Sequence, residues 1–255
     1  MKLIKWGVVL ILSFFIIQDP DPGTGNTPDP YMNHLPAKIK FHEFALDIYH
    51  NLDSPELNFN VFEIALKGYL SMKKDNMIKN KRVLSVVDFS KSGKEKRFFV
   101  IDLKKRKVIF KSLVAHGRNS GSDYANRFSN IPESYKSSLG FYITNETYRG
   151  KHGLSLRLDG KEKSINDNAR KRDIVIHGAD YVSDDFIRSR GRLGRSFGCP
   201  ALPVENTKAI IKAIKNKSCL FVYYPDHKYL NSSPILSNVE INDDDFQTLF
   251  DNELS

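Results

Sequence analysis

One histidine and one cysteine, each beside glycine, are the residues of this 255-residue chain best suited to covalent chemistry. His177 precedes Gly178, and Cys199 stands between Gly198 and Pro200. A free thiol has a pKa near ~8.5, so a nucleophilic cysteine needs a base or a positive neighbour at neutral pH. An imidazole titrates in that range and can take the thiol proton. The pattern predicts Cys199 as nucleophile and His177 as its base.

The glycine before the cysteine suggests how a tetrahedral intermediate would be stabilised. Gly198 can adopt a positive φ and lets the backbone approach a substrate closely. The amides of Gly198 and Cys199 could then donate to a developing oxyanion, each contributing roughly 2.7–4 kcal/mol. The imidazole also needs an orienting group. The candidates for it are the carbonyl of Gly178 and the carboxylates of Asp180, Asp184 and Asp185.

The elements that must position this pair are strands. His177 follows a predicted strand, and a loop at 179–198 leads from it to Cys199. Short β-rich runs separated by polar turns indicate a mainly β domain that begins with an antiparallel meander. The predicted strands are 83–89, 97–103, 107–116, 139–144, 154–158, 172–176 and 218–224. Cys219 lies in the last apolar run, which favours a buried core residue over a disulfide partner of Cys199.

Helical periodicity occurs on both sides of the strands. Apolar residues recur at helical spacing in 41–52 and again in 57–72, with a cap at Asp53-Ser54 and Pro55 in the first turn. This predicts an N-terminal helical hairpin. A further helix is expected at 206–215, after the nucleophile.

Charge is spread unevenly along the chain. The formal net charge is +9, but residues 37–231 carry 37 of the 39 basic and 21 of the 30 acidic side chains, a net charge of +16. A basic body favours an anionic partner. The hydrophobic fraction of 40% excludes a wholly disordered chain.

The N-terminus has the outline of a secretory signal. Lys2 and Lys5 precede an apolar run over 6–17, which is shorter than the ~20 residues of a comfortable membrane span. We therefore expect either a cleaved signal or an N-terminal anchor in the inner membrane, and export makes nucleic acid an unsuitable partner. The expected organisation is a signal or anchor at 1–18, a linker at 19–36, the helical hairpin at 37–76, a catalytic domain at 82–225 and an acidic tail at 232–255.

Seven ordered motifs between Phe41 and Tyr224 resemble the murein L,D-transpeptidase catalytic-domain family, relatives of the YkuD-type L,D-transpeptidases. They are 65–69, 87–90, 114–121, 137–142, 151–158, 177–182 and 194–201. The resemblance implies an L,D-transpeptidase-like β-sandwich catalytic domain with Cys199 as nucleophile and His177 as base. The chain departs from the broader YkuD pattern because Phe197 stands where that pattern has a second histidine, and Pro200 follows the cysteine.

Side chains around these motifs are candidates for binding substrate. Arg118, Asn119 and Arg195 could bind carboxylates or carbonyls of a stem peptide, since arginine suits bidentate carboxylate recognition. Ser196 belongs to the same expected set. His116 is either a substrate contact or second base, or a satisfied structural histidine; His152 is expected to be structural.

The function expected from these residues and the resemblance is that of an exported peptidoglycan L,D-transpeptidase in a bacterial periplasm or envelope. It would act on stem peptides through a Cys199 thioester, release D-Ala and form 3–3 cross-links or a protein anchor, without metal or cofactor. The alternatives are an L,D-carboxypeptidase or wall-link hydrolase on the same scaffold, a zinc hydrolase using His116, His177 and Cys199, and a non-catalytic wall-binding module.

Overall fold

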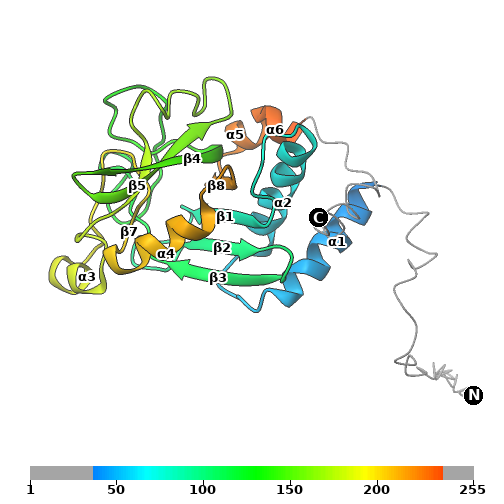
Figure 1. Cartoon of the computed structure of the whole chain (residues 1–255), viewed down its shortest axis with the longest axis horizontal. Coiled ribbons are helices and arrows are strands. Elements are labelled where there is room, and N and C mark those ends of the chain that lie inside the picture. Colours follow the sequence, from blue (N-terminus) through cyan, green and yellow to red (C-terminus); the bar gives the residue numbers. More distant parts are fainter. Residues whose placement is uncertain (1–36, 238–255) are drawn as a thin grey trace, which may run out of the picture. The chain divides into compact units, whose positions relative to one another are not determined.

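Residues 37–237 are the part of the chain that the computed structural model describes (Figure 1). The expected signal or anchor at 1–18, the linker at 19–36 and the tail residues 238–255 lie outside it. Within 37–237, no helix is long and apolar enough to cross a membrane.

Two helices joined by a turn form the predicted hairpin. α1 spans Ala37–Asn51 and α2 spans Phe59–Lys74. α2 begins later than predicted because its N-cap is Asn58, whose side chain accepts a hydrogen bond from the amide of Asn60. Asparagine is favoured there because it satisfies an amide that has no partner in the first helical turn. Ser54 and Pro55 lie in the turn instead.

The predicted antiparallel meander forms one half of the sheet. β1 (Val83–Asp88), β2 (Phe98–Asp102) and β3 (Lys107–Ser112) pair in sequence order. β8 (Cys219–Tyr223) lies on the other side of β1 and runs parallel to it. β1, β2 and β8 are buried along their whole length, as their nearly continuous apolar sequences suggest.

The other half holds the strands nearest the candidate site. β4 (Gly140–Gly150) pairs with β8 and, in a long hairpin, with β5 (Gly153–Gly160). β6 (Val175–Gly178) pairs with β5, and β7 (Ala201–Leu202) adds in parallel to β6. β4 extends well past the predicted 139–144 because the ladder continues through residues that face solvent and so carry no hydrophobic signal.

The two ends of this eight-stranded sheet meet, so the sheet is nearly closed. Its order is β3-β2-β1-β8-β4-β5-β6-β7. Just after β3, the amide of Ala115 donates to the carbonyl of Ala201 in β7 at 2.9 Å, and Gly117 forms a bridge with Ser196. The mainly β architecture is thus confirmed, and the core is enclosed by one sheet that curves back on itself and by the helices.

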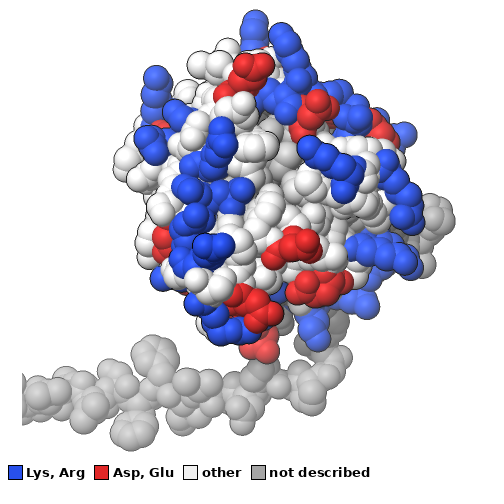
Figure 2. Space-filling model, turned by 90° about the vertical axis from the view of Figure 1, so that its left-hand side faces the viewer, with Lys and Arg blue, Asp and Glu red and all other residues white. Residues whose placement is uncertain are grey.

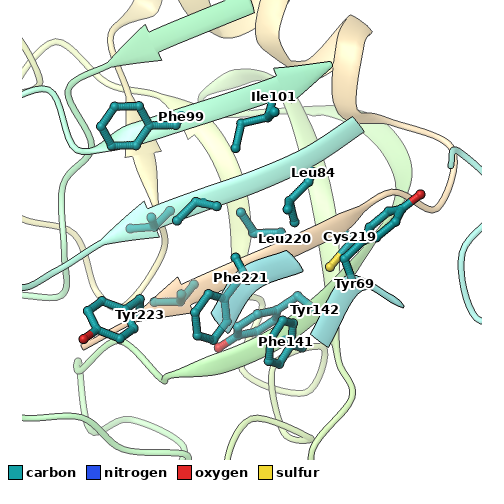
Figure 3. Packing of buried hydrophobic residues seen from close by; sticks show 14 of the residues in the cluster. Tyr69, Leu84, Phe99, Ile101, Phe141, Tyr142, Cys219, Leu220, Phe221 and Tyr223 are labelled. Carbon is teal, nitrogen blue, oxygen red and sulfur yellow. The ribbon is translucent and has the colours of Figure 1, made fainter. Parts of the chain in front are cut away.

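Buried hydrophobic residues of the sheet and of α2, several of them aromatic, form one cluster (Figure 3). The rings of Phe141 in β4 and Phe221 in β8 stack with centroids 4.2 Å apart. The α2 residues Leu66 and Tyr69 are fully buried in the same cluster. Cys219 is a free, fully buried thiol there, as predicted, and its sulfur lies 3.7 Å from Met72 Sδ.

Of the two helices between β6 and β8, the hydrophobic pattern predicted α4 but not α3. α3 (Asp184–Arg190) buries no residue and is set by its ends: Ser183 caps its first turn, and Gly191, with φ +72°, ends it. α4 (Val204–Ile214) follows β7, close to the predicted 206–215.

The residues just before 238 form two further helices. α5 (His227–Ser232) and α6 (Pro234–Ser237) pack on the domain. The buried carboxylate of Glu162 accepts hydrogen bonds from the hydroxyls of Tyr229 and Ser233. Two hydroxyl donors on one buried carboxylate hold these helices in place.

Substituting Gly68 tests the packing of α2 on β4. A Cβ at this position would lie 2.0 Å from Phe141 Cζ, so the buried ring would have to move. Alanine has the better helix propensity by about 1 kcal/mol, but overpacking a core costs typically 1–3 kcal/mol. We expect Gly68→Ala to lower the free energy of unfolding by about 1 kcal/mol or more in urea denaturation.

The matched control is Asn60→Ala on an exposed position of the same helix, which should change stability by less than about 0.5 kcal/mol. Equal or greater stability of the Gly68→Ala variant would contradict this packing.

Candidate active site

The pairing of β6 with β7 brings the bend that carries the predicted nucleophile beside the strand of the predicted base. His177 is in register with Ala201, and Cys199 precedes Ala201 by two residues. This bend runs alongside the start of β6. The amide of Val175 lies 3.5 Å from Cys199 Sγ, and Sγ lies 3.5 Å from the carbonyl oxygen of Asp173. Within 37–237 no hydrogen bond joins the sulfur to the imidazole, so transfer of the thiol proton requires the thiol to leave the Asp173 carbonyl.

The tautomer of His177 is fixed by its own neighbour. His177 Nδ1 lies 3.0 Å from the carbonyl oxygen of Gly178. A carbonyl only accepts, so Nδ1 carries the proton and Nε2 is left as the basic nitrogen. Among the orienting groups considered from the sequence, the Gly178 carbonyl is the one in this position.

Burial keeps the His177 imidazole neutral. The side chain is 4% exposed, and desolvation lowers its pKa. The Gly178 carbonyl opposes this shift, while the positive Lys151 and the ring of His152 add to it. A neutral imidazole at pH 7 is the form that can accept a proton.

His152 contacts the candidate base, which sequence reasoning missed. Its ring stacks on the ring of His177 with centroids 4.4 Å apart and an interplanar angle of 26°. His152 is exposed and lies in the turn between β4 and β5. The available signal was the antiparallel hairpin preceding the strand of His177, whose tip returns to that strand.

The resting thiol of Cys199 is also neutral. Burial raises its pKa; the Val175 amide and the positive Arg172 oppose this increase without cancelling it. The side chain is nevertheless half-buried, so a reagent can reach it. A neutral thiol needs a base to become a nucleophile, and the neutral imidazole of His177 on β6 is suited to that role.

Ser196 braces the loop that carries the cysteine. Its Oγ accepts from the amide of Gly198 at 3.0 Å and donates to the carbonyl of Cys199 at 2.6 Å. The Gly198 amide is therefore engaged within the protein, unlike the expectation that it faces an oxyanion. In the described part of the chain, the amide of Cys199 has no acceptor and is the free donor at this position.

Gly198 is required for the path of the backbone. Its φ is +127°, and a Cβ would lie 2.8 Å from the carbonyl oxygen of Lys136. Arg172, which sequence reasoning read only as the start of a strand, holds that opposing loop: its guanidinium donates to the carbonyls of Ser129 at 2.7 Å and Lys136 at 2.6 Å.

Arg118 forms an exposed cluster with two aromatic rings near the nucleophile. Its guanidinium lies 4.3 Å from the ring centre of Tyr135 and 4.8 Å from that of Phe197, which is 62% exposed. The amide of Arg118 donates to the carbonyl of Ser196 at 2.7 Å, which anchors the cluster to the cysteine loop. We call these three residues, Arg118, Tyr135 and Phe197, the arginine–aromatic cluster.

The other predicted binding residues mainly hold loops. Asn119 Nδ2 donates to the carbonyl of Ser134 at 2.9 Å. Arg195 Nη1 donates to the carbonyls of Gly121 at 2.9 Å and Arg118 at 3.2 Å. Burial and the nearby charges of Arg192 and Arg118 lower the pKa of Arg195. The guanidinium of Arg195 thus lies close enough to those of Arg192 and Arg118 to be repelled by both.

The side of the molecule with β5, β7 and α3 is mostly basic at its edge (Figures 1 and 2). Figure 2 shows Lys and Arg side chains around much of an uncharged middle area, with Asp and Glu side chains between them at the upper edge and below the middle. The excess of Lys and Arg favours anionic ligands on this face.

His116 lies in the interior and not in the site. It is 1% exposed, and its Nδ1 accepts from Arg97 Nη2 at 2.8 Å. Burial and the charge of Arg97 lower its pKa to about 4. This placement favours the structural alternative for His116. Within 37–237, no three His, Cys, Asp or Glu side chains are grouped to hold a metal ion.

The buried His116 predicts a pH-dependent stability. In the unfolded chain the imidazole takes up a proton below its ordinary pKa of 6.5, whereas the folded protein takes it up only near pH 4. The free energy of unfolding should therefore fall between these values, by about 3 kcal/mol from this group. His116→Gln should remove that part of the pH dependence in urea denaturation at pH 7 and pH 4.

The exposed His50 on α1 offers the control: His50→Gln should keep the wild-type dependence. If the free energy of unfolding of His116→Gln depended on pH as that of the wild type does, His116 would not be buried in its neutral form.

Comparison with known proteins gives the family. A model of the L,D-transpeptidase catalytic domain matches residues 53–223. A search of curated proteins found no match. Similar solved structures include L,D-transpeptidases from Mycobacterium smegmatis (14% identity, TM-score 0.36, covering 56% of this chain and 59% of that chain), Mycobacterium tuberculosis H37Rv (16%, 0.34, 56% and 58%) and Xylanimonas cellulosilytica (12%, 0.32, 55% and 60%).

This chain covers less than two thirds of the length of those structures. The family model, in contrast, extends from the turn before α2 to the end of β8 and includes both His177 and Cys199. The resemblance inferred from the sequence motifs is confirmed: the chain belongs to the family of L,D-transpeptidase catalytic domains.

Proposed function

We propose that this protein is a peptidoglycan L,D-transpeptidase that acts on stem peptides through a thioester on Cys199. The observation that carries the proposal is the β6–β7 pairing, which sets Cys199 beside the strand of an imidazole whose Nδ1 is held by Gly178. The family supports the class of reaction.

The acylation step follows from the geometry of the pair. The Cys199 thiol turns from the Asp173 carbonyl and gives its proton to His177 Nε2. The thiolate attacks the carbonyl of the diaminopimelate residue in the donor peptide, and the free amide of Cys199 donates to the resulting oxyanion. When the C–N bond breaks, His177 returns the proton to the departing amine of D-Ala, leaving a thioester.

The acceptor decides the product. An amine of a second stem peptide attacks the thioester, His177 removes a proton from that amine, and the thiol is regenerated with a 3–3 cross-link; the same step with a protein amine gives an anchor. Water in place of the amine gives carboxypeptidase activity. Since stem peptides lie outside the cytoplasmic membrane, this function requires export, for which the predicted signal or anchor at 1–18 is our proposal.

Changing Cys199 tests the chemistry. We expect Cys199→Ala to lower D-Ala release from tetrapeptide muropeptides by roughly 1,000-fold or more and to abolish the acyl-enzyme seen by mass spectrometry. Cys219→Ala is the matched control, because it removes the other, buried thiol and should keep the acyl-enzyme.

Products with and without an acceptor amine separate transfer from hydrolysis. No D-Ala release and no acyl-enzyme from the wild-type protein, together with unchanged wall binding by Cys199→Ala, would refute the proposal and favour a binding module.

The arginine–aromatic cluster is our proposed site for a carboxylate of the donor peptide. Both rings hold the Arg118 guanidinium, and within 37–237 its side chain has no acidic partner. A charge-assisted hydrogen bond contributes about 1.5–3 kcal/mol, so Arg118→Gln should raise KM roughly 10- to 100-fold with little change in kcat.

Arg127→Gln, an exposed arginine of the same loop, is the control and should leave KM unchanged. Substrates amidated at the terminal carboxylate or at the diaminopimelate carboxylate identify the group: the effect of Arg118→Gln should vanish for one of them. An equal effect on every substrate would contradict carboxylate recognition by Arg118.

A further inference from the structure

His152 has a contact that a purely structural turn residue would not need. It lies at the tip of the β4–β5 hairpin, where the two-residue turn Lys151–His152 joins Gly150 to its partner Gly153. The exposed ring of His152 stacks on the buried ring of His177 at 4.4 Å.

The hairpin register explains how the contact arises. Ser155 of β5 pairs with His177 of β6, so the turn reaches just past the end of β6. Gly153 has φ +72° and would meet nothing within 4 Å if it carried a Cβ. This left-handed conformation closes the tight turn, and the turn places the His152 ring on the ring of His177.

We propose that His152 is a positioning residue for His177: its ring clamps the imidazole against the Gly178 carbonyl and shields it from water, so that Nε2 stays aimed for proton exchange with Cys199. This inference rests on the proposed function for its catalytic meaning, but the clamp itself is a property of the folded protein.

The hydrogen bond to Gly178 alone does not fix the ring, because one in-plane contact at Nδ1 still permits the ring to tilt. A stacked neighbour restrains the face, so the two contacts together define the ring plane. Small misplacements of a catalytic group are costly: about 1 Å can reduce the rate 100-fold.

The groups that face His177 are few. The β4–β5 turn brings Lys151 and His152, and Cys199 lies two residues before Ala201, the β7 partner of His177. At the paired positions β5 presents Ser155 and β7 presents Ala201. From α4, Val204 and Thr207 lie against Gly178. Only Lys151, His152 and Cys199 of this set titrate, so a change at His152 should be visible in the pH behaviour of the pair.

The experiment compares His152→Ala, which removes the stack, with His152→Phe, which keeps a stacking ring that cannot titrate. The rate of Cys199 alkylation by iodoacetamide is measured from pH 5 to 9, together with kcat and KM for tetrapeptide turnover. His227→Ala, an exposed histidine of α5, is the matched control.

We expect His152→Ala to lower kcat about 10-fold with little change in KM. The pH below which alkylation of Cys199 slows should rise by about half a unit or more, because an exposed His177 protonates more readily. His152→Phe should restore kcat to within about threefold and return this pH to its wild-type value. The control should match the wild type.

Two results would overturn the proposal: a wild-type profile and kcat in His152→Ala, or equal impairment of the Ala and Phe variants, which would mean that the imidazole itself is needed. Alkylation requires no peptidoglycan substrate. The clamp therefore remains testable if the wild-type protein proves to release no D-Ala, and the two failures are distinguishable.

Discussion

The site depends on a very short piece of parallel sheet. β7 contributes only Ala201 and Leu202, which pair with His177 and Gly178. Two residue pairs make a weak ladder by themselves. Here the ladder is supported on one side by β5 and on the other by the bridge from Ala115 to Ala201, which nearly closes the sheet. The closure of the whole sheet thus fixes where the segment that carries Cys199 lies along β6.

The electrostatic state of the pair follows from that enclosure. Burial raises the pKa of Cys199 and lowers that of His177, so both groups rest neutral. A thiolate–imidazolium pair would be costly in the same surroundings. The positive charges of Arg172 and Lys151 favour the thiolate. In the proposed mechanism, proton transfer becomes favourable when an electrophile and the Cys199 amide take up the developing charge.

The parts of the fold that carry strong local signals were predictable from sequence. The meander, the helical hairpin and the buried Cys219 all follow from apolar periodicity. β4 beyond Thr144, α3 and the two-residue β7 lack that signal, because they are held by a ladder, by caps and by closure. In the site, residue chemistry alone nominated Cys199 and His177. The Arg172 brace depends on long-range contacts that no local pattern indicates, and the His152 stack could be inferred only from the hairpin that precedes the strand of His177.

His116 shows how a residue outside the site can still shape it. The buried Arg97 donates to His116 Nδ1, the carbonyl of His116 accepts from the amide of Ser196 at 2.9 Å, and Ser196 Oγ bonds the amide of Gly198. These bonds form a continuous polar chain from the core to the cysteine loop. Burial lowers the pKa of Arg97 to about 10, so it remains charged at neutral pH. A buried cation needs every acceptor that surrounds it, and this demand makes the chain rigid. The histidine of the 114–121 motif therefore supports the cysteine loop from the core, whereas Arg118 of the same motif is exposed.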